Sequence, residues 1–204
     1  MTKIHLIRHG VTYWNQELRY QGHSDISLTP EGERQAELMA TSFAQINLRA
    51  IYSSDLIRAQ STALKLGEQK QLSVTTNADF REINFGAWEG LTYEQIKAKW
   101  GNLIDDFFRA PGEVYLPQGE GFGDVYKRAV PNLLALLERH QGEEIAIVAH
   151  GGIIRVLLCY VLGLPLNNCW RIKQDNTAIN TITYFKDDMC MLERLNDVHH
   201  LTKI

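Results

Sequence analysis

Two short apolar segments, far apart in the chain, each end in a histidine followed by glycine. Residues 3–7 (KIHLI) read as a buried strand that leads into Arg8-His9-Gly10, and residues 144–149 (EIAIVA) lead into His150-Gly151-Gly152. Glycine lets the backbone turn sharply directly after a strand. Parallel strands bring their carboxyl ends to one edge of an open α/β sheet, where such sheets bind ligands. We therefore expect the two imidazoles to lie close together in one site.

Helical and strand patterns alternate along the rest of the chain. Thr29-Pro30-Glu31 has the hydroxyl cap, the first-turn proline and the acid that start a helix. Ser53-Ser54-Asp55 is expected to cap the next helix, and Pro131 should kink a later one. The other expected elements are a strand at 50–52, helices at 122–140 and 153–162, and a hairpin of 178–185 and 189–195 around 186–188.

This order predicts an α/β fold with three layers, α/β/α. We expect a mostly parallel sheet with helices on both faces and an antiparallel hairpin at its edge. No linker or repeat divides the chain, so residues 1–204 are expected to form a single domain. Within it, residues 91–120 should form a lid over the site.

Composition limits the kind of partner. The formal net charge is -3, so we expect neither nucleic acid nor an anionic membrane as a partner, and arginines near the histidines are better read as local anion ligands. Three scattered cysteines and the lack of a signal-like or spanning segment predict free thiols and a cytoplasmic location. His199-His200 lacks companion ligands, so no metal and no cofactor are expected.

The chain carries four motifs in order: Leu6–Gly10, Thr12, Trp14-Asn15, Gln21-Gly22, Asp25, Leu28-Thr29 and Gly32; Ser53–Leu56, Arg58-Ala59 and Thr62-Ala63; Arg81–Gly86 and Trp88–Gly90; and His150–Gly152. Together they resemble the histidine phosphatase superfamily, in its phosphoglycerate-mutase-like branch. The chain is most similar there to small bacterial broad-specificity phosphatases and α-ribazole phosphatases. It departs from many relatives at Val11, where they carry Glu, and at Gly121, where they carry Ser.

The resemblance implies a metal-independent phosphomonoester hydrolase that acts on small phosphorylated metabolites through a phosphohistidine at His9. His9 attacks as a neutral imidazole, and Arg8 and the turn at Gly10 both oppose a proton there. Arg58 resembles the family's second phosphate arginine, and with Arg8 and His150 it would stabilise charge on the phosphoryl group. The residues expected to complete substrate binding are Asn15, Gln21, Gly22 and Gly151.

Glu82 is expected to act as a general acid and base. An alkoxide is too basic to depart unprotonated at neutral pH, so a carboxylic acid must donate a proton to it. The same carboxylate can then take a proton from the water that hydrolyses the phosphohistidine. The alternative is that Glu82 forms a salt bridge with Arg81. Glu89 is a weaker candidate for the acid, and we expect it to be structural.

Two other functions stay open. A phosphoglycerate mutase would use the same residues and return the phosphoryl group to substrate, although the short chain between Glu82 and His150 favours hydrolysis. A non-catalytic phosphate-binding regulatory domain would be expected to lack at least one of five residues that are all present: Arg8, His9, Arg58, Glu82 and His150.

The expected lid suggests what the leaving group is like. Its basic residues are Lys97, Lys99 and Arg109, so a second phosphate on the substrate is not clearly provided for. Four of its aromatic residues favour a sizeable, partly apolar leaving group, although about two of them should be core; the four are Trp100, Phe107, Phe108 and Tyr115. Among the other histidines, His5 is expected in the core and the remainder at the surface or in loops: His23, His140, His199 and His200.

Overall fold

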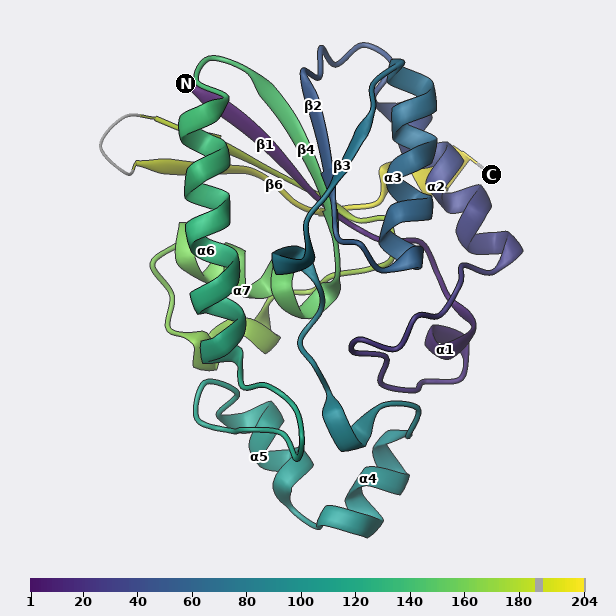
Figure 1. The fold of residues 1–204 in the computed structure, drawn as a ribbon, viewed down its shortest axis with the longest axis vertical. Helices are drawn as coiled ribbons and strands as arrows, with labels where there is room; N and C mark the ends of the chain where they lie inside the picture. The colour runs from purple at the N-terminus through teal and green to yellow at the C-terminus, as the bar shows by residue number, and fades with distance from the viewer. Residues whose placement is uncertain (186–188, 204) are drawn as a thin grey trace.

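A single six-stranded sheet forms the centre of the computed structural model, which describes residues 1–185 and 189–203 (Figure 1). The strand order is β3-β2-β4-β1-β5-β6. The first four strands in that order are mutually parallel, whereas β5 runs antiparallel to both β1 and β6. The strands are β1 (Thr2–Arg8), β2 (Ala50–Ser53), β3 (Val74–Thr76), β4 (Glu144–Ala149), β5 (Ile179–Tyr184) and β6 (Cys190–Asp197).

Helices cover both faces of the sheet, because successive side chains of a buried strand point to opposite sides. On β1, Leu6 packs in the cluster beneath α6 (Phe122–Arg139) and α7 (Gly151–Val161). Its neighbour Ile7 packs in the cluster beneath α2 (Pro30–Ser42) and α3 (Ile57–Lys70). The predicted α/β fold, the mostly parallel sheet and the antiparallel edge are thus confirmed. The expected hairpin turn at 186–188 lies outside the described residues.

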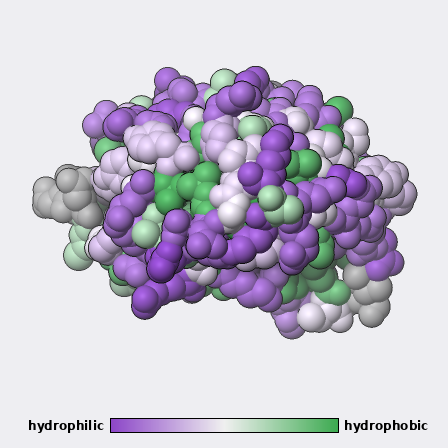
Figure 2. Space-filling view, turned by 90° about the horizontal axis from the view of Figure 1, so that it is seen from below, coloured by the Kyte–Doolittle hydropathy of each residue, from purple (hydrophilic) through white to green (hydrophobic). Residues whose placement is uncertain are grey.

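Most of the remaining short elements gather beyond the carboxyl ends of the parallel strands, whereas the C-terminal 3₁₀ turn η4 (His199–Lys203) packs beside α2 (Figure 1). Figure 2 shows this end of the molecule as mostly hydrophilic, with a small group of hydrophobic side chains near its middle. No helix within the described part of the chain is long and apolar enough to cross a bilayer. Besides η4, these elements are α1 (Tyr13–Gln16), α4 (Tyr93–Trp100), α5 (Leu103–Arg109) and the 3₁₀ turns η1 (Ala78–Phe80), η2 (Gly86–Trp88) and η3 (Leu166–Arg171).

Aromatic packing fixes α5 to the rest of the fold. Phe107 is fully buried and stacks on Phe122 of α6, with ring centroids 5.4 Å apart and planes 6° apart. Trp100 packs against the buried Trp88, whereas Phe108 and Tyr115 are exposed. Two of these four aromatic residues, Trp100 and Phe107, therefore serve the core, as expected.

The start of α3 differs from the expectation, whereas the kink expected at Pro131 of α6 stays a prediction. Leu56, rather than a polar side chain, is the N-cap of α3, although the Ser54 hydroxyl accepts a hydrogen bond from its backbone N–H. Gly121 caps α6 through backbone geometry, and its N–H donates to Asp124. The α6 helix is continuous through Pro131, whose side chain lies on the exposed side.

The histidines outside the site are more buried than expected. His5 is a core residue as predicted, and its ring nitrogens contact Thr181 and Glu144. His140 and His200 are buried, although His140 lies in the turn after α6, which fits the expected loop position, and His200 lies in η4. His140 bonds to the hydroxyl of Tyr52 at 2.8 Å, since both rings fill space between β2 and the end of α6.

Candidate active site

The two motif histidines leave adjacent parallel strands. β1 and β4 pair in register through Arg8 and Ala149, and the backbone N–H of His9 donates to the Ala149 carbonyl at 3.0 Å. The imidazole centroids of His9 and His150 consequently lie 5.2 Å apart. Both side chains are buried. The predicted meeting of the two imidazoles is confirmed.

Hydrogen bonds give the two imidazoles opposite tautomers. Nδ1 of His9 lies 2.7 Å from the Gly10 carbonyl, which can only accept, so Nδ1 carries the proton and Nε2 keeps a lone pair. Nδ1 of His150 accepts from Nε of Arg58 at 3.2 Å, so its proton is on Nε2. One ring therefore offers a nucleophilic nitrogen, and the other offers an N–H donor.

Burial and neighbouring guanidinium groups keep both rings neutral. Desolvation lowers the pKa of His9 well below its ordinary value, and the positive charges of Arg58 and Arg8 lower it further. The pKa of His150 is depressed for the same reasons, with desolvation the largest cause and Arg58 the next. A neutral His9 is the form that can attack phosphorus.

The two motif arginines are held in different ways. Arg8 donates from Nη1 to the Gln174 carbonyl at 2.6 Å, and its buried Nε has no partner among the described residues. Arg58 is fully buried and uses Nε, Nη1 and Nη2 for His150 and the carbonyls of Ser24 and Gly22. Three of its five N–H groups are thus engaged, which leaves two. Burial lowers the pKa of each arginine to about 10, so both stay charged at neutral pH.

Unpartnered buried donors mark the centre of the site. In the described structure, Nε of Arg8 and Nε2 of His150 are two of the few buried side-chain polar atoms without a hydrogen-bond partner. Leaving a buried donor unpaired is costly, so a site with two of them is built to receive an acceptor. Beside them lies a cavity of about 210 Å³, lined by Arg8, His9, Asn15, Arg19, Tyr20, Gln21, Gly22, Arg58, Glu82, Phe85, Gly151, Gly152, Arg155 and Trp170.

Glu82 joins this cavity to the first turn of α7. Its Oε2 accepts from the Gly152 N–H at 2.9 Å, and its Oε1 accepts from Ile153 and Ile83 at 3.1 and 3.0 Å. Unpaired N–H groups at a helix start attract a carboxylate, which explains this position. The alternative pairing with Arg81 is wrong, because Arg81 forms a bidentate ion pair with Asp55.

The backbone of Glu82 is also fixed. Its carbonyl accepts hydrogen bonds from His23 at 2.9 Å and from Arg128 at 2.8 Å. Arg128 further binds the carbonyls of Asp79 and Arg81 and pairs with Glu120. The backbone that carries Glu82 is therefore held in place by side-chain hydrogen bonds.

The loop before α2 supplies the polar wall. Oδ1 of Asn15 accepts from Thr12 in a capping box, and Oε1 of Gln21 also accepts from Thr12, at 2.9 Å. Their amide N–H₂ groups make no hydrogen bond to Thr12 and belong to side chains that line the cavity. Gly22 has φ +54°, and a Cβ there would lie 2.0 Å from Oε1 of Glu89. Glu89 itself binds the backbone N–H groups of the loop, which is a structural role.

Sequence reasoning missed several cavity residues, Arg155 above all. It lies four residues after Gly151 and so on the same face of α7, a spacing that would have identified it. Phe85, Tyr20 and Trp170 add aromatic surface. Residues 91–120 are all described, and none of them lines the cavity, so the lid stays a prediction.

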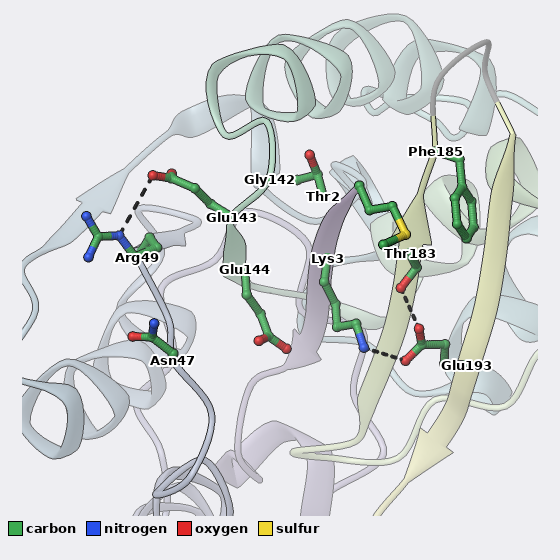
Figure 3. Close-up of a pocket in the computed structure, with 11 residues that line it drawn as sticks. Thr2, Lys3, Asn47, Arg49, Gly142, Glu143, Glu144, Thr183, Phe185 and Glu193 are labelled. Carbon is green, nitrogen blue, oxygen red and sulfur yellow. Dashed lines mark hydrogen bonds and ion pairs between the residues drawn. The ribbon is translucent and has the colours of Figure 1, made fainter.

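A larger cavity, of about 560 Å³, lies at the opposite edge of the sheet (Figure 3). Its cations are already paired: Lys3 with Glu193 at 2.8 Å, and Arg49 with Glu143 at 3.7 Å. It contains neither histidine of the site. The smaller cavity is therefore the one whose charges suit a phosphorylated ligand.

Known proteins with similar sequences span nearly the full length of this chain. Phosphoserine phosphatase 1 of Hydrogenobacter thermophilus is 32% identical over 201 residues, which cover 98% of this chain and 95% of that protein. A probable phosphoglycerate mutase, GpmB of Escherichia fergusonii, is 31% identical over 205 residues, with coverage of 98% and 95%.

Solved structures agree with the sequence matches. YhfR of Bacillus stearothermophilus superposes with a TM-score of 0.93 at 31% identity, covering 98% of this chain and all of that one. A putative alpha-ribazole-5'-P phosphatase of Escherichia coli superposes with a TM-score of 0.87 at 27% identity, and 97% of each chain is covered. Residues 4–198 match the histidine phosphatase superfamily (branch 1), and the chain belongs to that family.

Proposed function

We propose that this protein hydrolyses phosphomonoesters of small metabolites through a phosphohistidine on His9. The observation that carries the proposal is the opposite tautomers of the two adjacent imidazoles. His9 presents a lone pair on Nε2, whereas His150 presents an unpartnered N–H beside the unpartnered Nε of Arg8. A nucleophile surrounded by donors for phosphoryl oxygens suits in-line attack on phosphorus.

In the first step, Nε2 of His9 bonds to phosphorus and the bond to the ester oxygen breaks. Arg8, His150 and the two remaining N–H groups of Arg58 stabilise the negative charge of the transferring group. Protonated Glu82 gives its proton to the departing oxygen, so the product leaves as an alcohol. Asn15 and Gln21 orient the substrate with their amide groups.

In the second step, water attacks phosphorus, the bond to His9 breaks, and Glu82 accepts a proton from the water. The three backbone bonds of Glu82 suggest which oxygen exchanges that proton. Oε1 already accepts two N–H bonds, whereas Oε2 accepts one and so keeps a free lone pair. We infer that Oε2 gives and takes the proton while Oε1 keeps the carboxyl group on α7.

A phosphoglycerate mutase is the second candidate, since one relative is named a probable one. It would require the same phosphohistidine, followed by transfer to a phosphoglycerate hydroxyl instead of water. Incubation of the enzyme with 3-phosphoglycerate separates the two: release of inorganic phosphate supports hydrolysis, and formation of 2-phosphoglycerate without release supports the mutase.

His9→Ala tests the nucleophile. We expect the parent enzyme to release phosphate from p-nitrophenyl phosphate and to form an acid-labile phosphoenzyme in rapid-quench experiments. The variant should lose both, while its circular dichroism and thermal midpoint stay close to those of the parent. Substantial turnover by His9→Ala would overturn the assignment, and phosphate binding without turnover by the parent would favour a non-catalytic domain.

A further inference from the structure

Arg155 is a cation of the cavity that has no ion-pair partner among the described residues and no role in the proposed chemistry. It comes from α7, and its Nε donates to the Ile172 carbonyl at 2.7 Å. Its guanidinium carbon lies 5.0 Å from the ring centroid of Trp170, over the face of the indole. Among the described residues, no carboxylate forms an ion pair with it, and none accepts a hydrogen bond from its Nη1 or Nη2.

The Trp170 ring beneath Arg155 is held in place by a hydrogen bond and by ring packing. The indole N–H of Trp170 donates to the Phe107 carbonyl at 2.9 Å, and the Trp170 ring packs edge-on against Phe107 and Phe122. A guanidinium stacked on an aromatic face and fixed through Nε leaves the paired Nη1 and Nη2 edge free. That edge matches the two oxygens of a carboxylate.

The position of Arg155 places this edge beside the phosphoryl site. A Cβ built on Gly151 would lie 2.9 Å from Nη1 of Arg155 and 3.5 Å from Nε of Arg8. Gly151 thus provides the space in which the two arginines flank the start of α7. Arg155 lies between Arg8 and Trp170. In the proposed function Arg8 binds the phosphoryl group, and Trp170 is one of the aromatic residues that line the cavity.

The arginines of the cavity carry one more positive charge than a phosphoryl dianion can balance. Arg19 is paired with Glu17 at 2.5 Å, so Arg8, Arg58 and Arg155 are the lining arginines without an ion-pair partner among the described residues. When Glu82 is protonated for the first step, these three cations face a phosphoryl dianion. The remaining positive charge suits a monoanion better than a second phosphate dianion.

We propose that Arg155 binds a carboxylate on the leaving group, so that the preferred substrates are phosphorylated hydroxy acids or amino acids. This inference rests on the proposed phosphatase function. It agrees with the expectation from residues 91–120 that a second phosphate is not clearly provided for, and it adds a carboxylate to the partly apolar leaving group expected there.

The test compares two substrates that differ in the carboxylate. O-Phosphoserine carries it and phosphoethanolamine lacks it, while both keep the amine and the phosphoryl group. Arg155→Met keeps apolar volume against Trp170 and removes the charged fork. We expect kcat/KM for O-phosphoserine to fall about 10- to 100-fold, and kcat/KM for phosphoethanolamine to change by less than about threefold.

Two further variants sharpen the comparison. Arg155→Lys keeps the charge without the fork and should lie between the parent and Arg155→Met. Arg171→Met removes an exposed charge on η3, outside the cavity lining, and should affect neither substrate. Equal losses for the two substrates in Arg155→Met would place Arg155 in the phosphoryl site, and no loss for either would show that it binds no substrate group. Both results would overturn the proposal.

Binding measurements separate this inference from the proposed function. Calorimetry with His9→Ala and with the His9→Ala/Arg155→Met double variant reports O-phosphoserine affinity without turnover, and we expect weaker binding only when Arg155 is replaced. This test holds even if the parent enzyme hydrolyses neither compound. If propane-1,3-diol bisphosphate binding depends on Arg155 and O-phosphoserine binding does not, the group bound is a second phosphate and the carboxylate assignment is wrong.

Discussion

Single side chains in this site have two tasks, and Glu82 shows this most clearly. The carboxylate that we assign to proton transfer also accepts three backbone N–H bonds, two of them from the first turn of α7. A substitution at Glu82 therefore changes chemistry and local structure together. The two effects can be separated by the choice of substrate.

Glu82→Gln is expected to slow alkyl phosphates far more than aryl phosphates in the phosphorylation step. Glutamine cannot donate the proton that a basic alkoxide needs, a loss of about a hundred- to ten-thousand-fold, whereas an acidic phenol departs with little help. Single-turnover rates of His9 phosphorylation with both substrate types measure this. An equal loss for the two would assign Glu82 to structure alone.

The same variant should also lower stability. In the parent, both carboxylate oxygens of Glu82 accept backbone N–H bonds. In the variant, the amide nitrogen takes the place of one oxygen and cannot accept, so a hydrogen bond is lost beside the start of α7. We expect a cost of about 0.5–2 kcal/mol in the free energy of unfolding, as for the loss of a helix cap. Urea unfolding checks the value, and an unchanged midpoint would show that these bonds contribute little.

Sequence motifs identified the residues of the site better than they identified their partners. His9, His150, Arg58 and Glu82 were found because each follows a strand or lies in a contiguous motif. The ion pair of Arg81 with Asp55 was not predicted, because it depends on how the segment after β3 passes the end of β2. The role of an individual charge is set by tertiary neighbours that a local pattern does not contain.

At the scale of elements, the start of α7 organises the site. Gly151 and Gly152 open the helix directly after His150, and each faces a functional side chain. A Cβ on Gly152 would lie 2.4 Å from Oε1 of Glu82, whereas a Cβ on Gly151 would lie 2.9 Å from the flexible end of Arg155. Glycine is therefore needed at these two positions because a side chain would collide with Arg155 or Glu82, and not because the helix needs glycine to form.

Gly152→Ala should reduce activity without unfolding the protein. The new methyl group displaces the Glu82 carboxylate, so we expect kcat/KM for alkyl phosphates to fall at least about tenfold. Gly123→Ala is the matched control, since Gly123 holds the same second position in α6 with no atom within 4 Å of a new Cβ. The control should keep full activity and gain up to about 1 kcal/mol in stability. Full activity in Gly152→Ala would contradict this account.

Element boundaries were predicted well where local chemistry sets them. Thr29 caps α2 as expected, with its hydroxyl accepting the Gly32 N–H at 3.0 Å. The cap of α3 was predicted less well, because the N-cap residue is the buried Leu56, whose side chain makes no capping hydrogen bond. A polar N-cap residue can be recognised in a sequence, whereas an apolar N-cap residue such as Leu56 cannot.

At the scale of the whole molecule, burial of neutral histidines couples stability to pH. Desolvation is the largest cause that lowers the pKa of His5, His9, His150 and His200. The unfolded chain then binds more protons than the folded one once the pH falls below the ordinary histidine pKa of about 6.5. Stability from these groups is complete above that pH and is lost as the pH falls through the depressed folded pKa values.

We expect the free energy of unfolding to be nearly constant from pH 8 to 7 and to fall between pH 6.5 and 5. Each histidine contributes up to about 1.4 kcal/mol per pH unit in that range. Carboxylates with depressed pKa values, such as Asp55 and Glu193, add their loss only at lower pH. Urea titrations at fixed pH values measure the slope, and a flat profile down to pH 5 would contradict the burial argument.

The position of β1 in the sheet determines when during synthesis the sheet can form. The first strand of the chain pairs with β4 and β5, so both of its neighbours come from the last third of the sequence. During synthesis this apolar segment emerges long before either partner exists. The candidate active site, which needs the ends of β1 and β4 together, can form only after β4 has been synthesised. Such long-range pairing favours slow, all-or-none folding, so a truncated chain should have no partial activity and an exposed β1 that a chaperone would have to cover.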